Sequence, residues 1–472
     1  MIFERIEDPG LSQYAYIVGC AAAREVAIVD PRRDVDVFVD WAAADGVRIA
    51  HVLETHIHAD FASGARELAA RTGAVLHLSA YDAGEAYDVA FPHTPMADGD
   101  AITLGNVRIE AMHTPGHTPE HLAFLVYDTA RTAEAPLAML SGDFLFVGSV
   151  GRPDLLGEDA KAALAARQYE SVQRLWDLPD GLEIHPGHGA GSMCGAGMSG
   201  RPFATLGYER LANPYLAPDL TAEAFACRLL GSSPPFPPYY RRMKRLNSQG
   251  PPLLGGLPGL DRPLEPAELA ARAADGAVVL DVRGRFPFRD GHVPGALGIG
   301  LDGSLSTWAA WLVPYDAPLI LVCNPDALPL AVRALVRVGL DGVVGYLDGG
   351  MAAWAMAGLP VEGLPQLVPA ELAARLASGE PLVVLDVRTD DEFAQGHIDG
   401  ALHLMGGELG ESTIAVPRDG GPIAVVCRSG YRSTAAASAL VRAGFAAEDV
   451  ANLAGGMVAW RAAGLPEVRA AG

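Results

Sequence analysis

The chain has 472 residues, of which 50% are hydrophobic and 19% charged, and its formal net charge is −22. This balance is typical of a folded globular protein and excludes a disordered one, and the length predicts two to four domains. Nucleic acid and anionic membranes require a basic protein surface, so the excess of acidic residues argues against both as partners.

The N-terminal segment carries no sign of a secretory signal. Residues 2–8 read IFERIED, without a basic start or an apolar core. No apolar run in the sequence is long enough to span a bilayer. The cysteines are few and odd in number, which favours free thiols in a reducing compartment over a disulfide framework; they are Cys20, Cys194, Cys227, Cys323 and Cys427. We therefore expect a cytoplasmic protein.

Short apolar segments alternate with helical patterns over the first 245 residues. The pattern predicts a helix at 35–44 and strands at 14–18, 26–29, 49–54, 107–112, 122–127 and 137–140. The chain is dense in Pro and Gly between residues 230 and 266, and such a composition is typical of a domain linker. We therefore predict a first domain at 1–245 and a linker at 246–262.

The segment THIHADF at 55–61 follows one of the predicted strands. Its two histidines one residue apart, His56 and His58, can turn neutral imidazole nitrogens toward one cation. Three further pieces with a His or an Asp also follow strands, namely TPGH at 114–117, SGD at 141–143 and HPGH at 185–188. Together the four pieces predict a metal site.

After the linker the chain repeats itself with a period of about 105 residues, which is the size of a domain. The repeated pieces are VLDVR at 279–283 and 384–388, GHVPGA at 291–296 with GHIDGA at 396–401, and GGMAAW at 349–354 with GGMVAW at 455–460. Each copy also has a second buried strand, at 319–322 and 423–426. We predict two homologous α/β domains, at 263–362 and 366–470, each with a parallel sheet covered by helices.

The segment at 55–61 resembles the T-H-x-H-x-D-H signature of the metallo-β-lactamase superfamily, in which the last His binds a second metal. That position is Phe61 here, so the sequence predicts one metal rather than two. The first domain resembles the persulfide dioxygenase branch of the superfamily, close to glyoxalase II, which implies an αββα fold. The resemblance also implies that His56, His117 and Asp143 hold one Fe(2+) per chain, as a two-His, one-carboxylate face with open positions for the substrates.

The same resemblance gives supporting roles to other residues. It places His58, Asp60 and His188 around the metal as hydrogen-bonding groups rather than ligands. Arg152 matches a residue beside the substrate pocket of the family, although a surface arginine fits the sequence nearly as well. Cys194 lies in a Gly-rich loop just past His188, where it could accept or relay sulfur or be an incidental cysteine, and both alternatives stay open.

The two repeats resemble rhodanese domains in their D-V-R strand end, G-H-[IV]-x-G-A turn and G-G-M-x-x-W segment. In the second copy the loop CRSGYR at 427–432 matches the C-x-x-G-x-R form of active rhodaneses, between a buried strand and a helix. The backbone N–H groups of such a loop, the helix N-terminus, Arg432 and Arg428 favour a thiolate and stabilise an anionic persulfide. We therefore predict that Cys427 is the nucleophile.

The first copy differs in the same loop. Cys323 occupies the matching strand end, but the loop continues as NPDALP at 324–329, without either arginine or the glycine. Its two prolines lack N–H groups, and Asp326 adds repulsive charge. We predict that this domain is a degenerate, structural rhodanese module.

The resemblance as a whole implies an enzyme that oxidises a low-molecular-weight persulfide with dioxygen at mononuclear iron to sulfite, and transfers sulfur at Cys427 to give thiosulfate. One alternative is a glyoxalase-II-like zinc thioester hydrolase fused to a sulfurtransferase, against which Phe61 counts. Another is a sulfur carrier whose first domain only binds, against which the complete His and Asp set counts. The thiol carrier (glutathione, coenzyme A, bacillithiol or cysteine) and the oligomeric state, a homo-oligomer included, stay open.

Overall fold

The computed structural model describes residues 1–232, 234–302, 304–412, 416–418 and 421–469. The chain divides into two compact units, Met1–Gly256 with Val336–Gly339, and Leu257–Leu335 with Leu340–Gly472. The predicted end of the last domain, at residue 470, lies outside the described residues. None of the described helices is long and apolar enough to cross a membrane.

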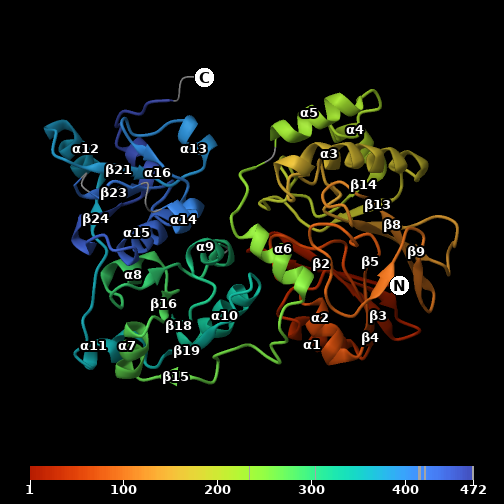
Figure 1. Ribbon diagram of the computed structural model, residues 1–472, viewed down its shortest axis with the longest axis horizontal. Coiled ribbons are helices and arrows are strands. Elements are labelled where there is room, and N and C mark those ends of the chain that lie inside the picture. Colours follow the sequence, from red (N-terminus) through yellow and green to blue (C-terminus); the bar gives the residue numbers. More distant parts are fainter. Residues whose placement is uncertain (233, 303, 413–415, 419–420, 470–472) are drawn as a thin grey trace. The chain divides into compact units, whose positions relative to one another are not determined.

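Two six-stranded sheets form the centre of the first unit (Figure 1). Their strand orders are β1-β2-β3-β4-β5-β6 and β14-β13-β10-β9-β8-β7, and β11 pairs with β12 separately. The strands are β1 Ile2–Asp8, β2 Gln13–Cys20, β3 Glu25–Val29, β4 Arg48–Leu53, β5 Val75–Ser79, β6 Thr94–Met96, β7 Ala101–Leu104, β8 Val107–His113, β9 Leu122–Asp128, β10 Ala138–Gly142, β11 Leu145–Phe146, β12 Ser149–Val150, β13 Glu183–Pro186 and β14 Ala204–Thr205.

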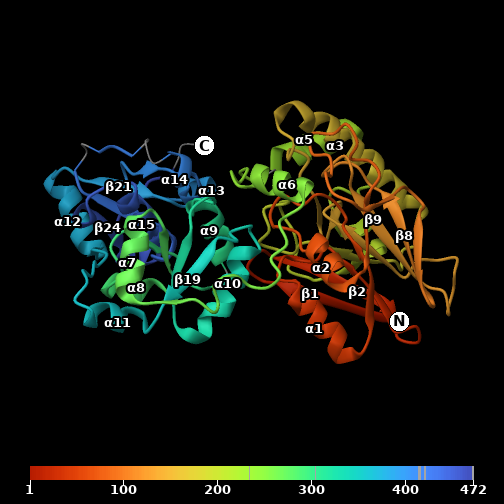
Figure 2. The same cartoon turned by 60° about the horizontal axis from the view of Figure 1, so that its bottom comes forward.

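Helices cover the outer faces of the two sheets (Figures 1 and 2). The helices of this unit are α1 Asp36–Asp45, α2 Ala65–Thr72, α3 Glu158–Gln173, the 3-10 helix η1 Arg174–Asp177, α4 Leu206–Ala212, α5 Ala222–Ser232 and α6 Tyr240–Gln249. One buried cluster joins α1 and α2 to the first sheet, a second fills the space between the sheets, and a third joins α3 and α5 to the second sheet. These layers confirm the predicted αββα fold.

The strand β9 shows how the sequence specifies these layers. Its residues 122, 124 and 126 belong to the cluster between the sheets, whereas 123, 125 and 127 belong to the cluster beneath the helices. Successive side chains of a strand point to opposite faces, so a strand with both faces buried has a continuous apolar sequence. The run LAFLVY is such a sequence.

Two of the four metal-motif segments follow β4 and β8, and the other two begin in the last residues of β10 and β13. Strand β4 is parallel to β3 and β5, and β10 is parallel to β13. Loops that leave the carboxyl ends of parallel strands emerge at one edge of a sheet, which is where ligands bind in α/β folds. The sheets therefore place these loops where their side chains can meet.

The second unit holds two five-stranded sheets in which every pair of neighbours is parallel. The strand orders β15-β19-β18-β16-β17 and β20-β24-β23-β21-β22 are the same when each copy is numbered from its start. We call the segment from β15 to α11 the first repeat and that from β20 to α16 the second repeat. The strands are β15 Pro263–Leu264, β16 Val278–Asp281, β17 Leu297–Gly298, β18 Leu319–Val322, β19 Val343–Leu347, β20 Gln366–Leu367, β21 Val383–Asp386, β22 Leu402–His403, β23 Ile423–Val426 and β24 Val450–Leu453.

Helices connect these parallel strands, as the repeat pattern predicts. In the first repeat they are α7 Pro266–Ala274, α8 Arg285–Asp290, α9 Leu305–Leu312, η2 Pro325–Ala327, α10 Leu328–Val336 and α11 Gly350–Met356. In the second they are α12 Pro369–Ser378, α13 Asp390–Ala394, η3 Gly406–Glu408, α14 Leu409–Ser412, α15 Arg432–Arg442, η5 Ala447–Asp449 and α16 Gly456–Ala462.

The residues that the two repeats share hold the fold together. In the first repeat, Arg283 donates to the Asp281 carboxylate and to the Gly291 carbonyl, 2.7 Å away. The same contacts recur at the matching positions of the second repeat. Because they tie a strand end to the turn after the next helix, the D-V-R and G-H pieces recur for structural reasons.

The two repeats also pack on each other within this unit. Helix α15 lies against β17 and α14 against α9. The Gly298 N–H donates to the Ser438 hydroxyl at 3.0 Å. The helix that follows the Cys427 loop is therefore in direct contact with the first repeat.

Candidate metal centre and sulfur-transfer loop

The side chains of His56, His117 and Asp143 converge in the first unit. Nε2 of His56 lies 3.8 Å and Nε2 of His117 lies 3.5 Å from Oδ2 of Asp143. These three atoms are buried and have no hydrogen-bond partner within the described structure. A buried polar atom left without a partner costs about 1–3 kcal/mol. Two imidazole nitrogens and a carboxylate oxygen left free within 4.8 Å of one another therefore fit a metal ion.

The remaining atoms of these side chains are engaged in hydrogen bonds. His117 Nδ1 donates to the carbonyl of Arg152 at 2.8 Å, which leaves Nε2 with the free lone pair of a neutral ring. Oδ1 of Asp143 accepts from Nδ1 of His188 at 2.7 Å, so Oδ2 is the free oxygen. Burial, with the neighbouring histidines, holds the pKa values of His56 and His117 well below the usual range. Both rings are therefore neutral and able to bind a cation.

Asp30 and Thr55 orient His56 in the same way. Thr55 donates its backbone N–H and its hydroxyl to the two carboxylate oxygens of Asp30, at 2.7 and 2.8 Å. Because that hydroxyl gives its proton to Asp30, its oxygen accepts from Nδ1 of His56 at 2.9 Å. Nε2 of His56 then carries the free lone pair. Thr55 belongs to the THIHADF segment, whereas Asp30 was not singled out from the sequence, because it lies 25 residues from Thr55 along the chain.

His58, Asp60 and His188 lie beside the three converging side chains. Nε2 of His58 is 3.2 Å from Oδ1 of Asp30. His188 bonds Asp143 through Nδ1 and Asp60 through Nε2, each at 2.7 Å. Burial opposes charge on His188, but the two carboxylates outweigh it and raise its pKa well above the usual value. His188 thus has no ring nitrogen free for an ion.

The position of the absent second-metal histidine is filled by an apolar ring. Phe61 is fully buried and packs on His58, with ring centroids 4.3 Å apart. Asp60, His188 and Cys194 form a second group of possible donor atoms within 4.8 Å of one another. Burial and the nearby carboxylates raise the pKa of Cys194 well above the usual value, so its sulfur is a neutral thiol. With the imidazole already bonded on both sides, this group is poorly suited to a second metal.

His121 is a part of the site that its sequence position did not reveal. Nε2 of His121 accepts the backbone N–H of Asp143 at 3.1 Å. Gly142, between that contact and Thr55, has φ +51°, a conformation that glycine adopts most readily. A Cβ there would lie 2.6 Å from the His121 ring and 2.8 Å from Thr55. The glycine of the SGD piece therefore allows the aspartate loop to pass between them.

Helix α6 clamps the THIHADF loop from outside. The Asn247 amide donates to the carbonyl oxygens of His58 and Phe61, at 2.8 Å each. The buried Lys244 ammonium donates to the Ile57 carbonyl at 3.0 Å. The helix ends at Gln249, past the predicted boundary at 245. The contacts between α6 and this loop could not be predicted, because they join residues distant in sequence and the helix follows a proline-rich stretch.

Arg152 and Cys194 are both 1% exposed. The Arg152 guanidinium pairs with Asp154 at 2.6 and 2.7 Å and also donates to the Met193 and Pro235 carbonyls. The Arg152 carbonyl also accepts from Nδ1 of His117, and a role of its side chain in binding substrate stays a prediction. The Cys194 sulfur lies 3.8 Å from the Tyr240 hydroxyl.

The loop after β23 forms the second candidate centre. Cys427 is fully buried, and its sulfur accepts from the Gly430 N–H at 3.1 Å and the Ser433 hydroxyl at 3.2 Å. The same hydroxyl lies 2.6 Å from Oδ1 of Asn452, an acceptor that shares its single proton with the sulfur. Gly430 has φ +88°, which turns its N–H toward the sulfur. Both donors stabilise negative charge on sulfur, and Ser433 was not predicted from the sequence.

The two arginines of this loop have different surroundings. Arg432 donates from both terminal nitrogens to the two carboxylate oxygens of Glu392, at 2.6 Å each. Burial disfavours the Glu392 carboxylate, but Arg432 outweighs this and holds its pKa below the usual value. Arg428 is exposed and forms no ion pair with any described residue. Arg432 is therefore a fixed part of the loop, whereas Arg428 is a free cation at its rim.

The matching loop of the first repeat lacks these features. Burial, with Asp281 nearby, raises the pKa of Cys323 to about 11, so this thiol is protonated at neutral pH. The side chains that surround the sulfur in the second repeat are replaced: Leu328 stands for Arg432, Pro329 for Ser433 and Pro287 for Glu392. The ion pair and the hydroxyl donor have thus been lost together.

Two family models match the chain. The model described as "Metallo-beta-lactamase superfamily" matches residues 8–188, and that described as "Rhodanese-like domain" matches residues 265–357 and 368–463. The crystal structure of a metallo-beta-lactamase from Staphylococcus aureus subsp. aureus COL is similar, with 32% sequence identity and a TM-score of 0.66. The match covers 73% of this chain and 98% of that one.

Curated relatives include a hydroxyacylglutathione hydrolase and a persulfide dioxygenase. A hydroxyacylglutathione hydrolase of Anaeromyxobacter dehalogenans (strain 2CP-C) is 31% identical over 251 residues, which are 48% of this chain and 89% of that protein. The mitochondrial persulfide dioxygenase ETHE1 of Bos taurus is 26% identical over 231 residues, 48% of this chain and 79% of that protein. The chain therefore belongs to the metallo-β-lactamase superfamily, has persulfide dioxygenase relatives, and carries two rhodanese-like domains in its C-terminal region.

Proposed function

We propose that the first unit oxidises a low-molecular-weight thiol persulfide with dioxygen and that Cys427 transfers sulfane sulfur in the second unit. In the oxidation, one persulfide R–S–SH, one dioxygen and one water give one thiol R–SH, one sulfite and two protons. The terminal sulfur supplies all the electrons that dioxygen takes up. Resemblance to persulfide dioxygenases and the presence of two rhodanese-like domains support this pairing of activities.

The observation that carries the first half is the set of three free, buried donor atoms on His56, His117 and Asp143. One carboxylate between two neutral imidazoles matches the face that holds non-haem iron(II), which supplies oxygenation chemistry at its open positions. The residues of the chain orient the donors: Thr55 fixes the ring of His56, and the Arg152 carbonyl fixes that of His117. These contacts keep each Nε2 free of a proton.

The second half follows from the donors around Cys427. Its thiolate attacks the terminal sulfur of a second persulfide and the S–S bond of the donor breaks. The departing thiolate takes up the proton that the terminal sulfur carried and leaves as R–SH. The enzyme then carries Cys–S–S⁻. The sulfite lone pair attacks the outer sulfur, which leaves as thiosulfate and returns the Cys427 thiolate. The Gly430 N–H and the Ser433 hydroxyl stabilise negative charge on the cysteine sulfur when it is a thiolate.

A zinc thioester hydrolase is the second candidate for the first unit. The relative named as a hydroxyacylglutathione hydrolase and the group Asp60, His188 and Cys194 favour it. Such an enzyme commonly uses a metal-activated hydroxide at a dinuclear centre. Phe61 and the His188 ring, which is hydrogen-bonded at both nitrogens, weigh against a second metal. We therefore favour persulfide oxidation over thioester hydrolysis.

Metal quantification on protein purified without oxygen, combined with an oxygen electrode, tests the proposal. We expect about one iron per chain and persulfide-dependent oxygen uptake. Two tightly bound zinc ions with thioesterase activity and no oxygen uptake would replace persulfide oxidation with the hydrolase. Protein that binds no metal and takes up no oxygen would leave the first unit a binding domain.

A further inference from the structure

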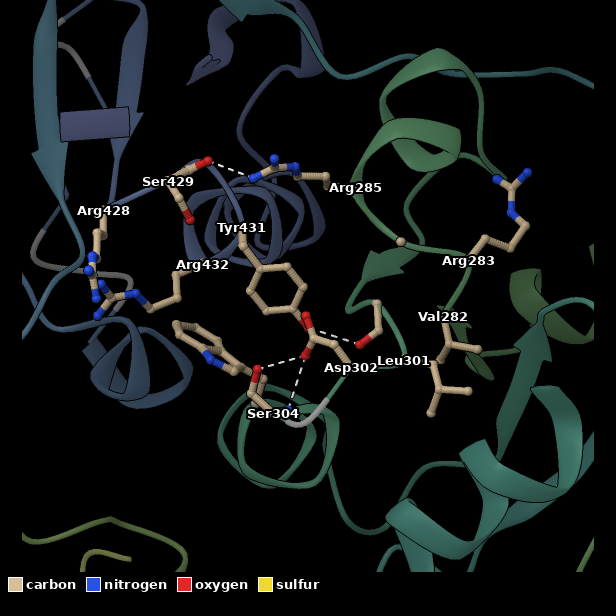
Figure 3. A pocket seen from close by; sticks show the side chains of 13 residues that line it. Val282, Arg283, Arg285, Leu301, Asp302, Ser304, Arg428, Ser429, Tyr431 and Arg432 are labelled. Carbon is tan, nitrogen blue, oxygen red and sulfur yellow. Dashed lines mark hydrogen bonds between the residues drawn. The ribbon is translucent and has the colours of Figure 1, made fainter. Parts of the chain in front are cut away.

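A pocket of about 700 Å³ lies beside the Cys427 loop, within the second unit (Figure 3). The second repeat lines one side with four side chains of the segment 428–432. The first repeat lines the other with the segments that follow β16 and β17, the start of α8, and Trp308 of α9. The repeat with the degenerate cysteine loop therefore forms much of the surface beside the intact one.

Two hydrogen bonds join the first repeat to this loop. Arg285 donates to the carbonyl of Ser429 at 2.6 Å, and the Tyr431 hydroxyl donates to the carbonyl of Gly300 at 2.9 Å. Figure 3 shows the Arg285 side chain reaching from the first repeat to Ser429, with Tyr431 between the two repeats. Arg285 is thus held at the edge of the pocket by Ser429, the residue that follows Arg428.

Four arginines and one carboxylate line the pocket, and the carboxylate, Asp302, accepts from the backbone N–H and the hydroxyl of Ser304. Arg283 and Arg432 pair with aspartate and glutamate carboxylates. Arg285 and Arg428 form no ion pair with any described residue, and Arg285 uses one nitrogen on a backbone carbonyl. In a chain with a net charge of −22, two such cations on one pocket mark a place where an anion binds.

Comparison of the two repeats shows that the rhodanese-like fold does not require a positive charge at the position of Arg285. Arg285 occupies the position that Asp390 holds in the second repeat, so the charge is reversed. The first repeat has lost the arginine of its own loop, where Leu328 now stands, and has a different arginine facing the loop of its neighbour. The pocket is also far larger than a sulfite ion, and pockets of about 300–1,000 Å³ suit ligands of several hundred daltons.

We propose that the first repeat supplies the donor-binding site of Cys427, in which Arg285, with Arg428, binds the anionic group of a low-molecular-weight thiol persulfide. This inference rests on the sulfur transfer at Cys427 proposed above. The anionic group is a carboxylate or a phosphate of the thiol carrier, since a guanidinium binds both. Arg285 acts by direct contact with the donor, and its bond to Ser429 holds it in place.

Sulfur transfer to Cys427 from donors of different charge tests this directly. The full-length chain, kept without oxygen so that persulfide is not oxidised, is mixed with glutathione persulfide (carboxylates), coenzyme A persulfide (phosphates) or neutral 2-hydroxyethyl persulfide. We expect Arg285→Ala to raise the half-saturating concentration of at least one anionic donor about tenfold, with the maximal rate and the neutral donor unchanged. Arg285→Lys should fall between. Arg289→Ala, on the same helix but paired with the neighbouring Asp290, is the matched control and should behave as the wild type.

The donor with the larger Arg285 dependence identifies the anionic group as carboxylate or phosphate. An equal loss with all three donors would show that Arg285 only braces the loop through Ser429, and would overturn the proposal. So would an unchanged half-saturation with both anionic donors.

A binding measurement separates this inference from the proposed function. The Cys427→Ser chain cannot transfer sulfur, but calorimetry can measure its affinity for reduced glutathione and for coenzyme A. About tenfold weaker binding of one of them after the added change Arg285→Ala supports the site even if no transfer is ever observed. Equal binding with and without Arg285 contradicts the site even if transfer at Cys427 proceeds.

Discussion

The two repeats of the second unit have the same sheet order, the same Asp–Arg bond at the end of one strand, and a buried tryptophan bonded to a proline carbonyl. They differ where a cysteine follows the fourth strand. In the second repeat the sulfur has an amide donor, a hydroxyl donor and an arginine braced by Glu392. In the first repeat the hydroxyl and the arginine are replaced by Pro329 and Leu328. The residues that build the fold are therefore separable from those that support sulfur chemistry.

The largest loss of activity should come from a substitution in the first unit, at the metal site. It should not change the difference between the two repeats. Asp143→Ala removes the only anionic donor of the metal site, so we expect oxygen uptake with persulfide to fall more than about 100-fold, since even outer partners of metal sites are worth 10- to 100-fold. Sulfur transfer from thiosulfate to cyanide should stay within about twofold of the wild type. Asp159→Ala, at an exposed aspartate of α3, is the control. Loss of both activities in a folded variant would contradict the independence of the two centres.

The second largest effect should come from placing a residue of the Cys323 loop in the Cys427 loop. Arg432→Leu introduces the side chain found at Leu328 and leaves Glu392 without its partner. We expect the rate of sulfur transfer to fall about 100-fold, the size of effect seen when a preorganised charge or donor is removed from a reaction centre. Stopped-flow measurement of persulfide formation at Cys427 checks this. A variant with wild-type rates would mean that the arginine is not what separates the two loops.

Ser433→Ala should have a smaller effect of the same kind. It removes one of the two donors to the sulfur, 3.2 Å away, and leaves Gly430 in place. A hydrogen bond to a charged group contributes about 1.5–3 kcal/mol, so we expect at least about a tenfold lower catalytic efficiency with little change in thermal stability. Ser438→Ala, further along the same helix, is the comparison variant. If the two alanine variants transfer sulfur equally well, the hydroxyl has no role at the sulfur.

The smallest effect concerns the cysteine of the first repeat at neutral pH. Burial raises the pKa of Cys323 to about 11, so its thiolate is only about one part in a thousand at pH 8. Alkylation of Cys323 by iodoacetamide, followed by mass spectrometry, should be slow at pH 7 and rise about tenfold per pH unit up to pH 10. A rate that already levels off near pH 8 would show an ordinary or activated thiol.

The fold and the outline of the metal site could be predicted from the sequence because their signals are local. The strand at 319–322 is itself an apolar run, and each of the four His- or Asp-bearing pieces stands next to one. The residues that orient those pieces could not be predicted, because Asp30, His121 and Asn247 act through contacts distant in sequence. The carbonyl groups that accept from Arg152 are likewise distant in sequence, since they belong to Met193 and Pro235.

The second repeat shows the same limit. The C-x-x-G-x-R loop is visible in the sequence, whereas Ser433 becomes recognisable only when α15 brings its hydroxyl to the sulfur. The first repeat had been predicted to be structural from its own loop alone. Its Arg285 reaches the neighbouring loop through a contact spanning 144 residues, which no pattern within either repeat could reveal.

Ion chromatography of sulfite and thiosulfate after aerobic turnover of persulfide tests the central claim most directly. The Cys427→Ser chain should still consume oxygen but accumulate sulfite where the wild type gives thiosulfate, because a serine hydroxyl cannot form the enzyme persulfide. The Cys323→Ser chain should give the wild-type products. An undiminished thiosulfate yield from Cys427→Ser, or a collapse of that yield in Cys323→Ser, would contradict the assignment of sulfur transfer to the second repeat.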